Sequence, residues 1–521
     1  MRRITPDDDV AVIGAGTMGA GIAEVAARAG HRVRLHDARP DAALRAVEGL
    51  RRRVERDVSR GRLDEATAAQ VLSRVTVAAA IDELAGCALV VEAVVEDLAV
   101  KQQLLRAVED VTGQGVGREV VLASNTSSLS ITAVGAGLAR PGLLVGLHFF
   151  NPAPRMALVE VVRGDATDPK VVETATELVR DWGKTPVQCS STPGFVVNRV
   201  ARPYYGEAQR LAERGAATPA TIDAVLREAG GFPMGPFQLT DLVGQDVNLA
   251  VSTSVWEQTY HDPRYAPTQF QRRLVDAGRL GRKSGRGVYA YASDGTPLDA
   301  TPATEPARPA PEVVELVEYD FGPMTPFLDR VAAAGVEVRH VTLDDEEVME
   351  ELPGLRLPGG GLLRVTDGST ARSWGLEAPE GVVLLDWAHD PATCTRVALI
   401  APRDLDPAVL AAAVGFCQAA GVEVSVVGDV AGGIVARTVA MLVDEAVDLV
   451  ARGEATATDV DVAMLLGAGY PSGPLEWGDR VGALRIASVL GELHDETPTG
   501  RYRMSPRLDE AIAAEENLRD L

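Results

Sequence analysis

The fold is decided by the stretch Val10-Ala11-Val12-Ile13-Gly14-Ala15-Gly16-Thr17-Met18-Gly19, an apolar run followed by a Gly-X-Gly-X-X-Gly pattern. In such a pattern the first glycine permits a tight turn, the second lets the backbone approach a pyrophosphate, and the third lets a helix pack closely on a strand. The free N–H groups at the start of that helix face the phosphates. The stretch therefore predicts a strand–turn–helix unit that binds a dinucleotide through Gly14, Gly16, Thr17, Met18 and Gly19.

An acidic residue follows the next apolar run, as a dinucleotide site requires. Residues 32–35 predict the second strand, and Asp37 comes just after them. A carboxylate there accepts hydrogen bonds from the adenosine ribose hydroxyls and repels a 2′-phosphate. We therefore expect the cofactor to be NAD rather than NADP. A simple glycine-rich turn is the alternative, and the strand–turn–helix–strand–Asp order disfavours it.

The first 190 residues alternate short apolar runs with amphipathic stretches, and helical patterns continue from there to about residue 291. The expected strands lie at residues 10–13, 32–35, 89–91, 120–123, 143–148 and 158–162. Strands that alternate with helices predict a parallel sheet covered on both faces. Five prolines among small residues between 296 and 312 indicate a linker.

One unit of the sequence occurs twice. Gly194 and Gly432 are 238 residues apart, and the same spacing separates Arg199 from Arg437, Glu207 from Glu445, and Asp223 from Asp461. We therefore expect an α/β fold in which an N-terminal Rossmann-type doubly wound sheet and an all-α helical domain are followed by a degenerate second copy of the same arrangement. The expected domains are an NAD-binding domain (1–190), a helical domain (191–292), a proline-rich linker (293–312), a degenerate α/β domain (313–428) and a second helical domain (429–521).

Two residues capable of acid–base chemistry lie in consecutive expected strands. His148 ends one apolar run, and Glu160 lies within the next. If the two strands are neighbours, the carboxylate reaches the imidazole and makes it a usable general base near neutral pH. A histidine at a strand end is more often structural, so the spacing alone leaves both interpretations open.

Two further polar residues are candidates for ligand binding. Ser127 follows the strand expected at 120–123, so its hydroxyl should open at the carboxyl edge of the sheet, where ligands bind. A helix cap is the alternative role for a hydroxyl in this segment. Asn198 offers a donor and an acceptor that suit a carbonyl or hydroxyl, or that are satisfied within the core.

Together these segments resemble the L-3-hydroxyacyl-CoA dehydrogenase family in order and spacing across residues 8–292. The resemblance implies NAD-dependent oxidation of an L-3-hydroxyacyl-CoA to the 3-oxoacyl-CoA. It implies that His148 takes the proton of the 3-hydroxyl and that Glu160 stabilises the imidazolium, while Ser127 and Asn198 hold the reacting oxygens. It also assigns three residues to the cofactor cleft, namely Glu96, Lys101 and Asn151.

The coenzyme A moiety of such a substrate requires cations. Arg52, Arg56 and Arg60 recur every four residues, on one face of an expected helix. They lie in the insert where the family places basic residues for the CoA phosphates, so we expect this face to bind the substrate. A solvated basic face is the alternative.

The second copy lacks the chemistry of the first. At the 238-residue offset, Asp386 replaces His148, Ala398 replaces Glu160 and Ala436 replaces Asn198. We therefore expect one active site per chain. The resemblance implies a homodimer joined through the helical domains. We therefore expect the second helical domain to take the place of a partner's domain, so that the chain is an intramolecular pseudo-dimer, with a homo-oligomer as the alternative.

The helical stretch from Gly235 to Asn248, together with the fused second unit, is similar to the phenylacetate-pathway members of the family. That similarity implies 3-hydroxyadipyl-CoA as the substrate, with 3-hydroxybutyryl-CoA as the alternative. A hydroxyacid dehydrogenase that does not use CoA is less favoured because of the basic insert. A non-catalytic NAD-binding protein is less favoured because the first copy keeps its catalytic residues.

The composition excludes other classes of protein. A net charge of -23 argues against a nucleic-acid partner, because phosphate backbones require a basic surface. No apolar run reaches the ~20 residues of a membrane helix, so we expect no membrane partner. Four scattered cysteines match neither a disulfide framework nor a metal site, and they favour a reducing cytoplasm.

Overall fold

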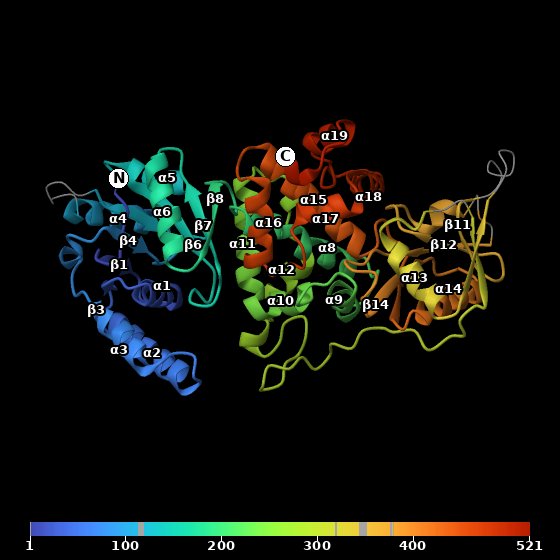
Figure 1. Ribbon diagram of the computed structural model, residues 1–521, viewed down its shortest axis with the longest axis horizontal. Coiled ribbons are helices and arrows are strands. Elements are labelled where there is room, and N and C mark those ends of the chain that lie inside the picture. Colours follow the sequence, from blue (N-terminus) through green and yellow to red (C-terminus); the bar gives the residue numbers. More distant parts are fainter. Residues whose placement is uncertain (1, 113–118, 318–319, 343–351, 376–377, 379) are drawn as a thin grey trace. The chain divides into compact units, whose positions relative to one another are not determined.

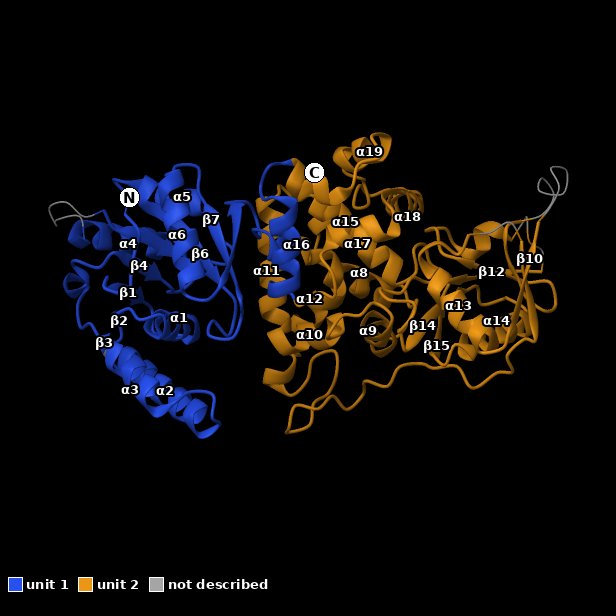
Figure 2. Ribbon diagram, in the orientation of Figure 1, with its two compact units in different colours: residues 1–199, 452–468 blue, residues 200–451, 469–521 orange. Residues whose placement is uncertain are grey.

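The computed structural model describes residues 2–112, 119–317, 320–342, 352–375, 378 and 380–521. The chain divides into two compact units, coloured separately in Figure 2. Unit 1 consists of Met1–Arg199 and Arg452–Ala468, and unit 2 of Val200–Ala451 and Gly469–Leu521. Residues 452–468, which the sequence assigns to the second helical domain, therefore lie in the same unit as the glycine loop.

Unit 1 is built on a sheet with the strand order β3-β2-β1-β4-β5-β6-β7-β8 (Figure 1). Its strands are β1 (Val10–Ile13), β2 (Val33–His36), β3 (Val75–Val77), β4 (Leu89–Glu92), β5 (Val121–Ser124), β6 (Leu144–Phe149), β7 (Leu158–Arg163) and β8 (Thr185–Ser190). Every neighbouring pair is parallel except β6 and β7. The strand order reverses at β1 and β4, so their carboxyl ends flank the crevice where such sheets bind dinucleotides.

Helices cover both faces of this sheet because the strands are apolar on both sides. Val10 and Val12 join one core cluster with residues of α1 and α6, whereas Ala11 and Ile13 point to the opposite face. The helices of unit 1 are α1 (Thr17–Arg28), α2 (Pro40–Ser59), α3 (Glu65–Arg74), α4 (Leu98–Thr112), α5 (Ile131–Gly135), α6 (Pro169–Asp181) and α16 (Ala457–Gly467), and α7 (Val197–Val200) begins at its boundary. This is the doubly wound arrangement that the sequence predicts.

Unit 2 contains a second sheet with the order β10-β9-β11-β12-β13-β14-β15. Its strands are β9 (Val313–Val317), β10 (Glu337–Val341), β11 (Gly354–Arg356), β12 (Leu362–Val365), β13 (Val382–Leu385), β14 (Arg396–Ala401) and β15 (Glu423–Gly428). From β12 to β15 the pairs are parallel, antiparallel and parallel, as they are from β5 to β8. The duplication therefore includes part of the sheet.

The helices of unit 2 are α8 (Arg202–Glu213), α9 (Pro219–Glu228), α10 (Pro236–Val243), α11 (Gln245–Gln258), α12 (Gln269–Asp276), α13 (Thr325–Ala333), α14 (Pro407–Ala419), α15 (Val435–Ala451), α17 (Pro474–Val481), α18 (Ala483–Glu496) and α19 (Pro506–Ala513). Among them, α9 and α14 pack on this sheet, and most of the others pack on one another to form the helical regions. Between residues 299 and 312 the described chain forms neither helix nor strand. Within the described residues, no helix has both the length and the apolar character needed to cross a bilayer.

Each sheet is completed at its edge by a segment of the other copy. In unit 1 the Ser190 N–H of β8 donates to the Glu454 carbonyl at 2.7 Å, and in unit 2 the Gly428 N–H of β15 donates to the Ala216 carbonyl at 2.8 Å. Both donors and both acceptors are 238 residues apart. The helix that follows the acceptor also packs on the sheet, α16 on β7 and β8, and α9 on β14. The two copies therefore exchange equivalent segments, which protects both sheet edges from further pairing.

Candidate active site

The glycine loop between β1 and α1 has the geometry of a phosphate-binding turn. Gly14 has a φ of +103°, and a Cβ there would lie 2.4 Å from the Ala93 carbonyl oxygen. A Cβ on Gly19 would lie 1.7 Å from the Gly14 carbonyl oxygen, so the helix packs against the turn only because residue 19 is a glycine. Apart from Gly16 itself and its two chain neighbours, no described heavy atom lies within 4 Å of the Cβ position of Gly16. The loop and the first residues of α1, Thr17 and Met18, thus leave room for a pyrophosphate.

Asp37 lies beside this loop, one residue beyond β2. Its carboxylate accepts hydrogen bonds from the Ala15 N–H at 2.8 Å and the Arg39 N–H at 2.9 Å. Burial raises the pKa of Asp37, but these hydrogen bonds outweigh it and lower the pKa below its usual value. The ionised carboxylate is therefore placed where a ribose hydroxyl of a bound dinucleotide would donate to it.

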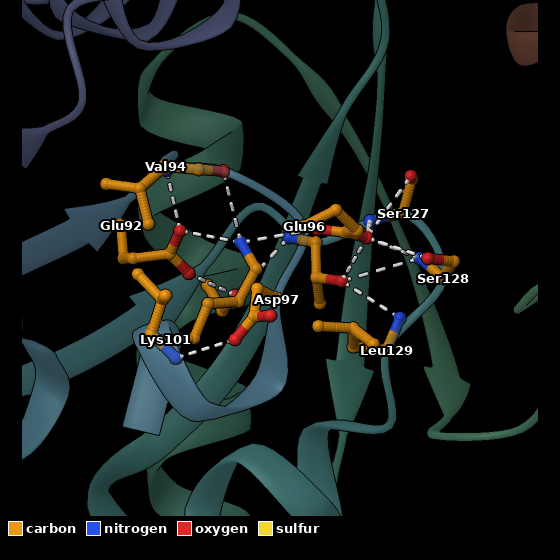
Figure 3. A network of polar contacts seen from close by, with 11 residues as sticks. Glu92, Val94, Glu96, Asp97, Lys101, Ser127, Ser128 and Leu129 are labelled. Carbon is orange, nitrogen blue, oxygen red and sulfur yellow. Dashed lines mark hydrogen bonds and ion pairs between the residues drawn. The ribbon is translucent and has the colours of Figure 1, made fainter. Parts of the chain in front are cut away.

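A buried ion pair anchors the carboxyl end of β4 (Figure 3). Lys101 Nζ of α4 lies 2.6 Å from Glu92 Oε1, and both side chains are at most 1% exposed. The Ser124 hydroxyl and the Val94 N–H donate to the same carboxylate, each at 2.7 Å. These contacts give the buried ammonium and carboxylate groups polar partners in the core. Lys101 is therefore part of the framework under the crevice.

The ammonium of Lys101 also reaches Glu96, which holds the loop after β5 (Figure 3). Lys101 Nζ lies 3.3 Å from Glu96 Oε2. Glu96 Oε1 accepts the Thr126 hydroxyl at 2.6 Å and the Ser127 and Ser128 N–H groups at 3.0 Å each. Burial raises the pKa of Glu96, but the Thr126 hydrogen bond and the charge of Lys101 outweigh it and lower the pKa. The structure thus brings Glu96, Lys101 and Ser127 into one cluster.

His148 and Glu160 face each other across β6 and β7. The two strands are antiparallel neighbours, and their register pairs these two residues directly. His148 Nδ1 lies 2.5 Å from Glu160 Oε2, and both residues are buried. The imidazole packs against the rings of Phe150 and Phe195, with ring centroids 4.6 and 5.7 Å away.

The second oxygen of Glu160 is held by the segment that leads into α7. The Val196 and Val197 N–H groups donate to Glu160 Oε1 at 3.1 and 2.9 Å. Since the carboxylate accepts on both oxygens, it selects the imidazole tautomer with the proton on Nδ1, which leaves a lone pair on Nε2. Asn198 follows directly in α7, so it is carried by the same segment.

A basic cleft of about 490 Å³ joins the cofactor loop to the α2–α3 insert. It is lined by Thr17 at the start of α1, by Asn151 after β6, and by Arg28, Arg53, Arg56, Arg60, Arg62 and Arg155. Glu24 pairs with Arg28 and Arg53, each at 2.9 Å. Of the three arginines expected to bind the substrate, Arg56 and Arg60 line the cleft. The third, the exposed Arg52, does not line it and lies 3.5 Å from Glu48.

The equivalent position in the second sheet holds a structural carboxylate. Asp386, in the place of His148, accepts the N–H groups of Ile434, Val435 and Ala436 at 2.7 to 3.0 Å. Ile434 and Val435 are the counterparts of Val196 and Val197, whose N–H groups hold Glu160 in the first copy. Burial raises the pKa of Asp386, and the hydrogen bonds oppose that rise. The helix start is therefore retained while the base is lost.

Three residues of the first site lack an obvious signal in the sequence. Glu92 lies within an apolar run, Asn125 accepts the Phe149 N–H through Oδ1 at 2.9 Å, and Glu454 belongs to the second copy. For Asn125, the only indication in the sequence is the run of polar residues at 124–128, at the end of β5. The partners of Glu92 and Glu454 are set by tertiary contacts.

Comparisons with known proteins agree with this geometry. The family model described as "3-hydroxyacyl-CoA dehydrogenase, NAD binding domain" matches residues 9–192, and the C-terminal domain of the same family matches twice, at 194–291 and 432–520. A model described as "3-hydroxybutyryl-CoA dehydrogenase reduced Rossmann-fold domain" matches residues 363–430. The matches therefore include both copies of the helical region and part of the second sheet.

Two individual relatives match nearly the whole chain, and a third matches about half of it. A protein named "3-hydroxyadipyl-CoA dehydrogenase" from Escherichia coli is 41% identical over 495 residues, 95% of each chain. A solved Escherichia coli structure titled as a 3-hydroxybutyryl-CoA dehydrogenase has a TM-score of 0.85 and 39% identity, and covers 98% of both chains. An (S)-3-hydroxybutyryl-CoA dehydrogenase from Ralstonia eutropha, with a TM-score of 0.53 and 37% identity, covers 55% of this chain and 99% of its own.

The predictions of fold, cofactor and enzyme class are thereby confirmed. The NAD-binding model covers the glycine loop, Asp37 and the His148–Glu160 pair, and the duplicated C-terminal model covers the repeat. The chain belongs to the 3-hydroxyacyl-CoA dehydrogenase family and is an NAD-dependent oxidoreductase that acts on 3-hydroxyacyl-CoA.

Proposed function

We propose that the first-copy site oxidises 3-hydroxyadipyl-CoA, with His148 as general base and Glu160 as its orienting partner. The observation that carries this proposal is the buried 2.5 Å contact between His148 Nδ1 and Glu160 Oε2 at the sheet edge that also carries the glycine loop. Glu160 is fixed by two N–H donors, so it can stabilise an imidazolium without reorganising.

The glycine loop and Asp37 fit NAD, and the polar residues of the first-copy site each have a part in the proposed reaction. NAD, when bound, supplies the acceptor for the hydride that leaves C3 of the substrate. His148 Nε2 takes the proton of the 3-hydroxyl, and Glu160 holds the charged ring in place. Ser127 and Asn198 are proposed to hold the reacting oxygens so that the C3 hydrogen is directed correctly.

The basic cleft is proposed to bind the phosphates of coenzyme A. Arginine suits this role because its planar group forms paired hydrogen bonds with phosphate. No described carboxylate pairs with Arg56, Arg60 or Arg155, whereas Glu24 already holds Arg28 and Arg53. We therefore assign the phosphate contacts to Arg56, Arg60 and Arg155, and not to Arg52.

Arg56→Ala should raise the KM for the acyl-CoA about tenfold, the effect of losing roughly 1.4 kcal/mol of binding energy, and leave kcat within about twofold. Steady-state kinetics at fixed, saturating NAD measure both constants. Arg52→Ala, four residues away on the same helix, is the matched control and should leave the KM within about twofold. A larger effect of Arg52→Ala than of Arg56→Ala would contradict the assignment.

The adipyl substrate is supported by the name of the Escherichia coli relative that matches 95% of both chains. The second Escherichia coli match is titled with the butyryl substrate, so the two esters are the comparison to make. The test is NADH formation with 3-hydroxyadipyl-CoA and 3-hydroxybutyryl-CoA in parallel. A higher kcat/KM for the adipyl ester supports the proposal. A higher kcat/KM for the butyryl ester would overturn it and indicate an enzyme of short-chain acyl-CoA metabolism.

We also propose that the chain is an intramolecular pseudo-dimer. Within unit 2, Tyr265 donates to Glu445 at 2.6 Å, and Tyr502 donates to Glu207 at 3.0 Å. The two glutamates are 238 residues apart, so each copy contributes to the other's buried cluster. The matched family segments support the NAD-binding domain, the two helical domains and the C-terminal part of the degenerate α/β domain expected from the sequence. The free, buried cysteines, which include Cys87, suit a reducing cytoplasm.

A further inference from the structure

We infer that Glu454, a residue of the second copy, is a positioning residue for the active site of the first copy. It binds the segment 190–199, whose N–H groups hold Glu160 and which carries Asn198. The inference rests on the His148–Glu160 pair proposed above as the catalytic machinery. It gives the second copy a role in the reaction although that copy has no catalytic pair of its own.

Glu454 is joined to this segment at three points. Its side chain forms an ion pair with Arg199, and its Oε2 accepts the Thr192 hydroxyl at 2.9 Å. Its backbone carbonyl accepts the Ser190 N–H at 2.7 Å. The Arg199 and Glu454 side chains are 5% and 13% exposed, so solvent screens the pair only weakly. All of these residues belong to unit 1.

The same segment connects directly to the catalytic carboxylate. Val196 and Val197, between Thr192 and Arg199, donate their N–H groups to Glu160 Oε1. Gly194 and Phe195 have φ values of +81° and +49°, a sharp turn that aims both N–H groups at the carboxylate. A shift of the segment would move Glu160, and through it the imidazole of His148, together with Asn198.

The second copy provides an internal comparison. Ala216 occupies the position of Glu454 beside the second sheet, and Ala216 keeps the backbone bond but has no carboxylate. Arg437, the counterpart of Arg199, lies instead 3.5 Å from Glu496 and 3.7 Å from Glu207. At this position, the residue beside the first sheet, which has the His–Glu pair, is therefore a glutamate, and the residue beside the second sheet is an alanine. This difference favours a role of Glu454 in the site over a general role in closing the sheet edge.

The test compares Glu454→Gln with Glu496→Gln in the full chain. Both changes are isosteric and both remove a carboxylate from one of the two equivalent arginines. Glu454→Gln should lower kcat between about 10- and 100-fold, the range expected for a displaced catalytic group, and leave the KM for NAD within about twofold. Glu496→Gln should leave kcat within about twofold, and the Tm of both variants is measured so that a loss of kcat can be compared with any loss of stability.

A double-variant comparison separates a specific contact from general damage. If Glu454 acts through Arg199, then Arg199→Gln combined with Glu454→Gln should lower kcat no more than about threefold beyond the stronger single variant, because contacting residues are not additive. An unchanged kcat in Glu454→Gln, or losses that multiply in the double variant, would overturn the inference. His148→Asn is measured in parallel to test the proposed catalytic pair separately. If the His148→Asn variant keeps its activity, the pair proposed above is wrong.

Discussion

His148→Asn lowers kcat about 10³-fold and leaves the Kd for NADH within about twofold, because the asparagine can keep the hydrogen bond to Glu160 but cannot take up a proton. The imidazole is buried and paired with Glu160 at 2.5 Å, so no exposed surface charge is changed. Kinetics with saturating substrate and NAD give kcat, and fluorescence titration of NADH gives the Kd.

Glu160→Gln is the companion variant. Glutamine presents only one acceptor oxygen, whereas Glu160 accepts from His148 on one oxygen and from Val196 and Val197 on the other. We expect a loss of about 10²-fold in kcat, smaller than for His148→Asn, because the base remains but its orientation and charge stabilisation are weakened. If His148→Asn kept kcat within about tenfold of the wild type, His148 would not be the base.

Glu207→Gln is expected to lower the free energy of unfolding of unit 2 by about 3 kcal/mol, because it leaves a buried arginine without its carboxylate. Glu207 is fully buried, and Arg501 Nη2 lies 2.7 Å from its Oε1. Burial raises the pKa of Glu207, but the charges of Arg501 and Arg437 outweigh it, so the folded-state pKa is lowered. Denaturant unfolding followed by circular dichroism measures the effect.

The sign of the pH dependence follows from that lowered pKa. Glu207 stabilises the fold above its unfolded-state pKa of about 4.3, and this contribution is lost as the pH falls through the lower folded-state pKa. The difference in the free energy of unfolding between wild type and Glu207→Gln should therefore be largest near neutral pH and shrink in acid.

The control is Asp404→Asn, which breaks the ion pair between Asp404 and Arg372. These two side chains are 71% and 67% exposed, so the change should lower the free energy of unfolding by less than about 1 kcal/mol. Equal effects of the two variants would contradict the buried network.

Much of the first sheet is predictable from the sequence because its central strands are buried on both faces. The run at residues 10–13 matches β1, and the other five expected strands lie within a residue or two of β2, β4, β5, β6 and β7. The sequence pattern does not predict β3 and β8, the two edge strands. Both are partly exposed, so their residues carry no continuous apolar run.

The basic insert shows where periodicity reaches its limit. A spacing of four residues correctly indicates a helix, α2, which contains Arg52 and Arg56 and ends just before Arg60. It does not say which side of that helix faces the cleft, because this depends on how α2 packs on its neighbours. The cleft is lined by Arg53 and Arg56, three residues apart on α2, and by Arg60 at the C-cap of that helix.

The 238-residue offset reveals a duplication but not an exchange. Ser190 and Gly428 occupy equivalent edge positions, so either sheet offers the same backbone donor to either helical region. Which copy's segment binds which sheet is decided by the path of the chain. The contact between Glu454 and Arg199 could therefore not be inferred from the pattern of the sequence.

The most direct test uses 3-hydroxyadipyl-CoA carrying deuterium at C3, incubated with the enzyme and NAD, with the reduced nicotinamide recovered and analysed by mass spectrometry. A dehydrogenase that transfers hydride from C3 of the CoA ester predicts deuterium in the nicotinamide product, and no turnover of the free acid 3-hydroxyadipate. Unlabelled reduced nicotinamide, or turnover of the free acid at a rate comparable to that of the ester, would contradict the assigned reaction.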